Sequence, residues 1–289
     1  MQIHSCLRLL IGLAVCSAEL GLGRHTLRAE QRTPELIQEV QQGAWRCAIG
    51  PNVTVRTTAR QVDPKAICLL CEDYRTRTIQ RWLAPEVGAS QSWTPRCEVV
   101  VHSTQAEYQR ALGPAAGSSV GCSTVQVKHG KVLVRKIDVR IDAAGWQVDA
   151  LPHEMTHIVL TDYFGERKLP LWADEGMSVL AESSAKCRLR KQAAEAEELR
   201  LPAISAASLL LEPAEQQARR QAFYYRSAEL VNFLIQQKDY PTFIRFLDQV
   251  EQQGYERALH AEYGIRGVAQ LQTIWHKRQP QTFFVTHVE

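Results

Sequence analysis

The sequence predicts an α+β fold in which a small, mostly antiparallel sheet packs on a helix at residues 147–163 and a helical subdomain follows. Two observations predict it. Between residues 53 and 141, several short runs alternate apolar and polar residues, as strands with one buried face do. From residue 146 onward, apolar residues recur every three or four positions, as they do along half-buried helices. The chain of 289 residues, 45% hydrophobic and 22% charged, is long enough for one medium-sized domain.

Residues 1–18 are typical of a signal peptide. A basic residue, Arg8, precedes the short apolar stretch 9–16, and small residues near Ala18 offer a cleavage site. This stretch is shorter than the roughly 20 residues that a membrane-spanning helix needs. We therefore expect an exported protein (periplasmic, in the cell envelope or secreted) with no stable membrane span after leader removal. The alternatives are a buried N-terminal helix and a lipoprotein that begins at Cys16.

The cysteine content is consistent with export. Cleavage near Ala18 would leave six of the eight cysteines, namely Cys47, Cys68, Cys71, Cys97, Cys122 and Cys187. An even number in an exported chain indicates up to three disulfides, and free buried thiols are the alternative. The C-x-x-C spacing at 68–71 also occurs in zinc knuckles and redox pairs, but a knuckle needs a second close pair, which this sequence does not have.

The N-terminal α/β part, residues 34–145, is predicted to contain the sheet. Leu36, Ile37 and Val40 have the spacing of a short helix that starts near Pro34. The elements expected after it are strand 53–58, helix 63–83, strand 97–102, a short helix capped by residues 103–104, and a hairpin of strands 124–128 and 132–141.

The second part, residues 146–278, is predicted to be helical. The helices expected in it lie at 147–163, 173–186, 214–237, 241–252, 255–262 and 267–278. The charged run at 188–198 is interpreted as a solvated helix face.

The sequence His153-Glu154-Met155-Thr156-His157 is an H-E-x-x-H motif on an otherwise apolar helix. Because residues i and i+4 share one helix face, both imidazoles can reach the same zinc ion. Glu154 lies beside the first ligand, where it can take a proton from a zinc-bound water. Unpaired histidines in such a helix would cost free energy that metal coordination removes. The alternative is a pair of core histidines satisfied by hydrogen bonds.

A catalytic zinc usually has three protein ligands and a water, so one ligand is still missing. The helix predicted at 173–186 turns back across the first and carries Asp174 and Glu175. Adjacent residues diverge by about 100° on a helix, so only one of the two carboxylates can point directly at the metal. Glu175 is the predicted ligand and Asp174 its competitor.

The motif at 153–157, followed by Trp172-Ala173-Asp174-Glu175-Gly176, resembles the gluzincin clan of metallopeptidases, which includes thermolysin and the aminopeptidase N family. In that clan the glutamate of such a segment is the third zinc ligand, which implies Glu175 rather than Asp174. The helical tail is similar to that of exported bacterial proteins of the peptidase MA-like type. The resemblance covers roughly residues 95–278.

The resemblance extends to the segment that starts with Tyr224-Tyr225. In aminopeptidase N relatives a tyrosine at this place hydrogen-bonds the oxyanion of the tetrahedral intermediate, which implies that role for Tyr224, with Tyr225 as a packing residue. The Gly-x-Met-Glu-Asn segment of the aminopeptidases is absent, so exopeptidase activity is not expected. Thermolysin relatives orient the first histidine with an Asp where this chain has Val179, so Glu182 or another carboxylate must do so.

We therefore expect a zinc metallopeptidase, an endopeptidase acting on peptides or proteins, with one Zn²⁺ per chain. Its alternatives are a catalytically silent zinc-binding module and a zinc hydrolase of a non-peptide substrate. The intact Glu154 argues against the silent module, since a structural zinc has no need of that carboxylate. The net charge of +3 is small and no basic run is interleaved with aromatics, so nucleic-acid binding is not expected.

Overall fold

A computed structural model of the chain describes residues 37–83, 92–201, 203–211 and 219–277. The predicted signal peptide at 1–18 and both of its alternatives lie outside these residues. The sheet and helices of the described residues all belong to one compact unit. No helix among the described residues combines the length and apolar character that crossing a bilayer requires.

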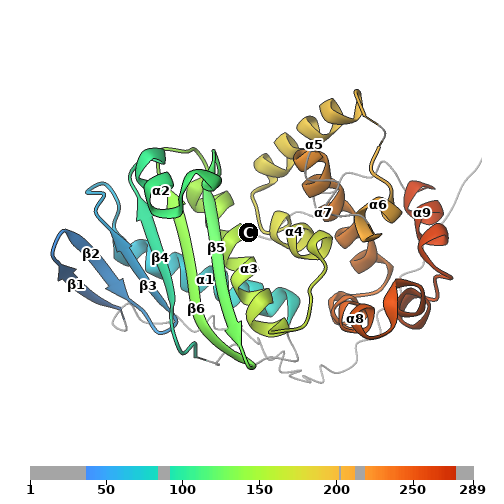
Figure 1. The fold of residues 1–289 in the computed structure, drawn as a ribbon, viewed down its shortest axis with the longest axis horizontal. Helices are drawn as coiled ribbons and strands as arrows, with labels where there is room; N and C mark the ends of the chain where they lie inside the picture. The colour runs from blue at the N-terminus through green and yellow to red at the C-terminus, as the bar shows by residue number, and fades with distance from the viewer. Residues whose placement is uncertain (1–36, 84–91, 202, 212–218, 278–289) are drawn as a thin grey trace, which may run out of the picture. The chain divides into compact units, whose positions relative to one another are not determined.

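One mixed six-stranded sheet, in the order β1-β2-β3-β4-β6-β5, contains the described strands (Figure 1). The strands are β1 (Gln38–Gln42), β2 (Trp45–Ile49), β3 (Val53–Thr57), β4 (Cys97–His102), β5 (Gly121–Lys128) and β6 (Lys131–Arg140). The pairs β1–β2, β2–β3 and β5–β6 are antiparallel, whereas β3–β4 and β4–β6 are parallel. The predicted strands at 53–58 and 97–102 and the predicted hairpin are confirmed.

The two parallel pairs arise from crossover connections, which return the chain to the same end of the sheet. Helix α1 (Pro64–Trp82) joins β3 to β4, and Asp63 caps it by accepting a hydrogen bond from the Lys65 backbone. Helix α2 (Gln105–Leu112), capped by Thr104, and the 3₁₀ turn η2 (Pro114–Ala116) follow β4. The α+β class is confirmed. The sheet is mixed, because the sequence locates the strands but not the order in which the crossovers place them.

The helix predicted to start near Pro34 is wrong for its described residues, since Ile37 lies in no helix and Val40 lies in strand β1. Gly43, with φ of 60°, lies in the tight turn between Gln42 and its partner Trp45. This conformation is one that glycine adopts without steric cost, as two-residue hairpin turns require. The side chains of β1 are mostly exposed at the sheet edge, so the apolar spacing that suggested a helix does not mark a buried helix face.

The C-terminal half is helical. Its described elements are a π-helical turn η3 (Trp146–Ala150), α3 (Leu151–Phe164), α4 (Leu171–Val179), α5 (Ser184–Glu198), α6 (Ala206–Leu211), α7 (Arg220–Gln237), α8 (Tyr240–Tyr263) and α9 (Val268–Lys277). The single helix predicted at 173–186 is two helices, because Ser183 caps α5 by accepting a hydrogen bond from the Lys186 backbone. Helix α6 was not predicted, and α8 is kinked at Gly254 between the two helices predicted there.

Helix α3 lies between the sheet and the other C-terminal helices (Figure 1). It contacts β5 and β6 on one side and α4 on the other, and α1 packs beside it on the same face of the sheet. Leu151, Met155 and Ile158 of α3 are fully buried. Packing on both sides fixes the position of the α3 backbone. The backbone in turn fixes the directions in which the polar side chains of α3 point.

Helices α4 and α7 approach closely at Gly176. A Cβ atom there would lie 2.7 Å from the Ser227 carbonyl oxygen and 2.7 Å from Val231 Cγ2. Gly176 directly follows Glu175, and Ser227 lies about one helical turn after Tyr224. The close approach therefore sets the distance between the predicted third ligand and the predicted oxyanion donor.

The six described cysteines are free thiols, five of them buried. The interpretation as up to three disulfides is therefore wrong, and the alternative of buried thiols describes the structure. Cys68 Sγ faces the Val53 carbonyl and Cys187 Sγ faces the Val179 carbonyl, both at 3.5 Å. Burial raises the pKa of the Cys68 and Cys187 thiols to about 12, so both remain protonated and poorly reactive.

Replacing Gly176 by Ala should destabilise the fold, since the new methyl group would push α7 away from α4. We expect a loss of about 1–3 kcal/mol in the free energy of unfolding, measured by urea denaturation. Ser227→Ala is the matched control at the same crossing. The Ser227 hydroxyl is buried without a hydrogen-bond partner among the described atoms, so its removal should cost less than about 1 kcal/mol or stabilise the protein. Equal losses from the two variants would contradict this account of the crossing.

Candidate metal centre

The two histidines of the H-E-x-x-H motif converge on one point. Pro152 occupies the first turn of α3, and His153 and His157 follow one turn apart on the same face. Their Nε2 atoms lie 3.1 Å apart, and the side chains are 10% and 15% exposed. Two ring nitrogens this close and this buried need a proton or a cation between them.

Glu175 on α4 completes the cluster. Its Oε2 atom lies 3.5 Å from His153 Nε2 and 3.8 Å from His157 Nε2. This oxygen is buried and has no hydrogen-bond partner in the described part of the chain. The three potential ligand atoms lie within 4.8 Å of one another. An orphaned carboxylate oxygen that faces two imidazole nitrogens fits a metal ion, which would satisfy all three at once.

Two further carboxylates hold the outer edges of the imidazoles. His153 Nδ1 lies 2.8 Å from Glu182 Oε1, and His157 Nδ1 lies 2.7 Å from Asp174 Oδ1. A carboxylate at Nδ1 favours the tautomer that carries its proton there. The Nε2 lone pairs are then free to face Glu175 and a metal ion.

This arrangement bears on the alternatives that the sequence left open. Asp174 stands behind His157, so its carboxylate faces the ring edge rather than the cluster. Glu182 supplies the orienting group that Val179 cannot. Arg190 Nε donates to Glu182 Oε2 at 2.6 Å, with an 11% exposed side chain. The interpretation of 188–198 as a solvated helix face is therefore wrong for Arg190.

The carboxylates make the cluster a site for positive charge. Burial opposes protonation of His157, but Asp174 and Glu175 outweigh it and raise its pKa to about 10. Burial is likewise outweighed at His153, whose pKa is raised by Glu175 and Glu182. Burial also opposes ionisation of Glu175, yet the two imidazoles lower its pKa. A divalent cation would meet the same negative charges that otherwise hold protons on the rings.

Glu154, the second residue of the motif, points its carboxylate toward strand β5. Its Oε2 accepts a hydrogen bond of 2.7 Å from Ser123 Oγ, and the residue is 9% exposed. Glu154 directly follows His153 on α3, so its carboxylate extends from the position next to a potential ligand. A carboxylate that adjoins a metal site without joining it can act as a general base.

The two adjacent tyrosines of α7 point in different directions. The Tyr224 hydroxyl interacts with Glu175 and accepts a hydrogen bond of 3.0 Å from Arg220 Nε. Tyr225 is 4% exposed and interacts with Glu229 instead. The structure therefore brings Tyr224 to the cluster and packs Tyr225 away from it.

Sequence reasoning did not identify Ser123 and Arg190 as part of the site. Gly121 and Ser123 precede the alternating run at 124–128, and the same alternation places both on one face of the strand. The packing of α3 on this face is a tertiary contact, and no local sequence pattern indicates it. Arg190 lies eight residues after Glu182. The other charged residues around it made this helix face look solvent-exposed in the sequence.

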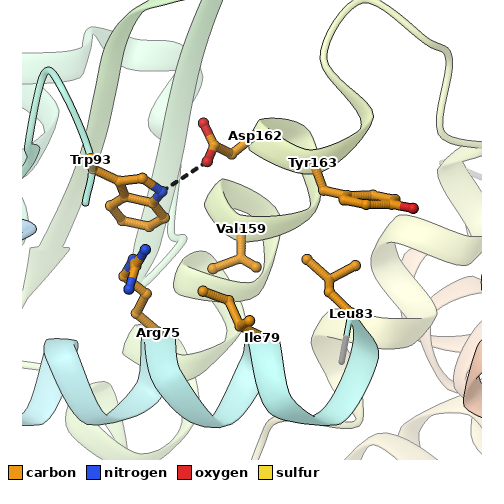
Figure 2. A pocket seen from close by; sticks show the side chains of 7 residues that line it. All are labelled: Arg75, Ile79, Leu83, Trp93, Val159, Asp162 and Tyr163. Carbon is orange, nitrogen blue, oxygen red and sulfur yellow. Dashed lines mark hydrogen bonds between the residues drawn. The ribbon is translucent and has the colours of Figure 1, made fainter. Parts of the chain in front are cut away.

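A separate pocket borders the opposite side of α3 (Figure 2). It is lined by Arg75, Ile79, Leu83, Trp93, Val159, Asp162 and Tyr163. Trp93 Nε1 donates to Asp162 Oδ2 at 2.8 Å, and Arg75 and Arg135 place their guanidinium groups 4.5 and 5.0 Å from the Trp93 ring. The pocket's carboxylate is thus engaged in holding Trp93 against α3. We assign this pocket a structural role.

Comparison with known proteins shows a family resemblance. The family model described as the Peptidase MA superfamily matches residues 123–279, which is more than half of the chain. The matched region begins at Ser123 and includes β6, α3 and all the helices that carry the cluster. No curated protein matches the sequence.

Glu175→Gln and Asp174→Asn should separate ligand from orienting residue. Glu175→Gln should abolish tight metal binding, because a neutral amide oxygen is a poor replacement for the carboxylate. Asp174→Asn should weaken binding by about 10- to 100-fold, as loss of an orienting group does. Chelator competition measures both affinities. Glu195→Gln, at a 52% exposed side chain on α5, is the control and should bind like the unmodified chain. A larger loss from Asp174→Asn than from Glu175→Gln would reverse the assignment.

Proposed function

The chain belongs to the Peptidase MA superfamily, and on that premise we propose that it is an exported, zinc-dependent endopeptidase of the gluzincin type. The observation that carries the proposal is the cluster of His153 Nε2, His157 Nε2 and Glu175 Oε2 within 4.8 Å. Two neutral imidazoles and one carboxylate are the ligand set of many catalytic zinc sites, which leave a fourth position for water or substrate. One Zn²⁺ per chain follows from the single cluster found among the described residues.

The residues around the cluster would divide the work of peptide hydrolysis. A zinc ion bound there would supply a Lewis acid that polarises the peptide carbonyl and acidifies water. Glu154 would accept the proton of the attacking water and pass it to the leaving amine nitrogen. Glu182 and Asp174 would keep the two imidazoles oriented while the charge at the centre changes.

Tyr224 would stabilise the developing oxyanion. Its hydroxyl interacts with Glu175, which supports a role for Tyr224 beside the carbonyl oxygen of a bound peptide. Arg220 donates to the same hydroxyl, which strengthens it as a hydrogen-bond donor. A donor aimed at the oxyanion is worth about 10²–10³ in turnover.

Peptides or proteins are the proposed substrates. The absence from the sequence of the Gly-x-Met-Glu-Asn segment favours an endopeptidase. The silent-module alternative has less support, because Glu154 is intact and its carboxylate is held by Ser123. Export is proposed from the N-terminal leader alone.

The mature protein should bind about one zinc ion per chain, measured by elemental analysis, and should hydrolyse a broad peptide library. Glu154→Gln should retain the zinc ion and the fold yet lose nearly all hydrolysis, because an amide cannot take a proton from water. A chain that binds zinc tightly but cleaves no peptide would support the silent module. Absence of metal from a folded sample prepared without chelator would overturn the proposal.

Tyr224→Phe should lower turnover by about 10²–10³ without a change in melting temperature, since only one hydroxyl is lost. Tyr225→Phe is the matched control on the neighbouring residue and should leave turnover within a few-fold. Steady-state hydrolysis of the best peptide gives both values. The reverse order of effects would move the oxyanion role to Tyr225.

A further inference from the structure

Strand β5 presents two unusual positions to the general base. Gly121 and Ser123 pair with Val139 and Ile137 of β6, both fully buried. Side chains that alternate along a strand put these residues on the same face, and that face packs against α3. Glu154 of α3 meets the strand at these two residues.

Ser123 provides a hydrogen bond to the base. Its Oγ donates to Glu154 Oε2 at 2.7 Å, an ordinary length for an O–H···O hydrogen bond. The contact joins residues 31 positions apart in the sequence, so it links the sheet directly to α3. It engages one oxygen of the carboxylate and leaves the other available for a proton.

Gly121 provides space for that other oxygen. A Cβ atom at this position would lie 2.8 Å from Glu154 Cγ and 3.0 Å from Oε1. Any larger side chain must therefore displace the carboxylate. The glycine and the serine act on the two sides of one carboxylate, and together they leave it little freedom to rotate.

We propose that Ser123 and Gly121 are positioning residues for Glu154, which hold its carboxylate in the pose that receives the proton of the attacking water. The role rests on the proposed peptidase function. Rotation of an unrestrained glutamate among its rotamers would reduce the fraction of time that the carboxylate holds this pose. Misplacement of a reacting group by about 1 Å can cost about 10²-fold in rate.

Steady-state kinetics of the zinc-loaded mature chain test the role. Ser123→Ala should lower kcat about 10- to 100-fold with unchanged KM and zinc content. Ser123→Thr keeps the hydroxyl and should restore kcat to within about threefold of the unmodified chain. Gly121→Ala should lower kcat as Ser123→Ala does. Thr124→Ala removes an exposed hydroxyl from the opposite face of β5 and should have no effect. An unchanged kcat in Ser123→Ala, or no rescue by Thr, would overturn the proposal.

A melting experiment on metal-free protein separates this inference from the proposed function. Ser123→Ala should lower the melting temperature by about 2 °C or more when Glu154 is present, and should not lower it in a Glu154→Ala background. Equal shifts in the two backgrounds would show that the residues are not coupled and would overturn the inference. A chain without peptidase activity that still shows the coupling would instead refute the proposed function alone.

Discussion

The pairing of each imidazole with a carboxylate is the interaction on which the rest of the site depends. Glu182 lies 2.8 Å from His153 Nδ1 and Asp174 lies 2.7 Å from His157 Nδ1. Both carboxylates come from the chain that follows α3: Asp174 lies on α4, and Glu182 lies in the turn between α4 and α5. The break between α4 and α5 allows Glu182 to face His153. Arg190, on α5, donates a hydrogen bond to Glu182 and neutralises its charge.

Both halves of the chain contribute side chains to the site. Strand β5 supplies the groups that hold Glu154, α4 supplies Glu175, and α7 supplies Tyr224. Helix α3 lies between these elements and carries the histidines (Figure 1). Because every element packs directly on α3 or on α4, the proposed base, ligands and oxyanion donor are fixed relative to one another by contacts rather than by long loops.

Local sequence signals predicted the elements and ligands that have local causes. The H-E-x-x-H spacing needs only one helix to bring its histidines together, and Asp63 and Thr104 mark helix starts by capping. Contacts between distant elements were not predictable in the same way. The contact between Ser123 and Glu154 depends on the packing of β5 on α3. The parallel strand pairs result from crossover connections, whose course the local sequence does not indicate. Whether two cysteines can form a disulfide depends on their distance in the folded chain, which the sequence does not give either.

The central claim is that His153, His157 and Glu175 form one zinc centre. X-ray absorption at the zinc edge, measured on the mature protein loaded with one equivalent of zinc, tests it most directly. The account predicts two imidazole nitrogens at about 2.0–2.1 Å, oxygen in the remaining positions and no sulfur. Loss of one imidazole contribution should accompany His157→Ala. A sulfur neighbour at about 2.3 Å, or a spectrum that His157→Ala leaves unchanged, would contradict the account.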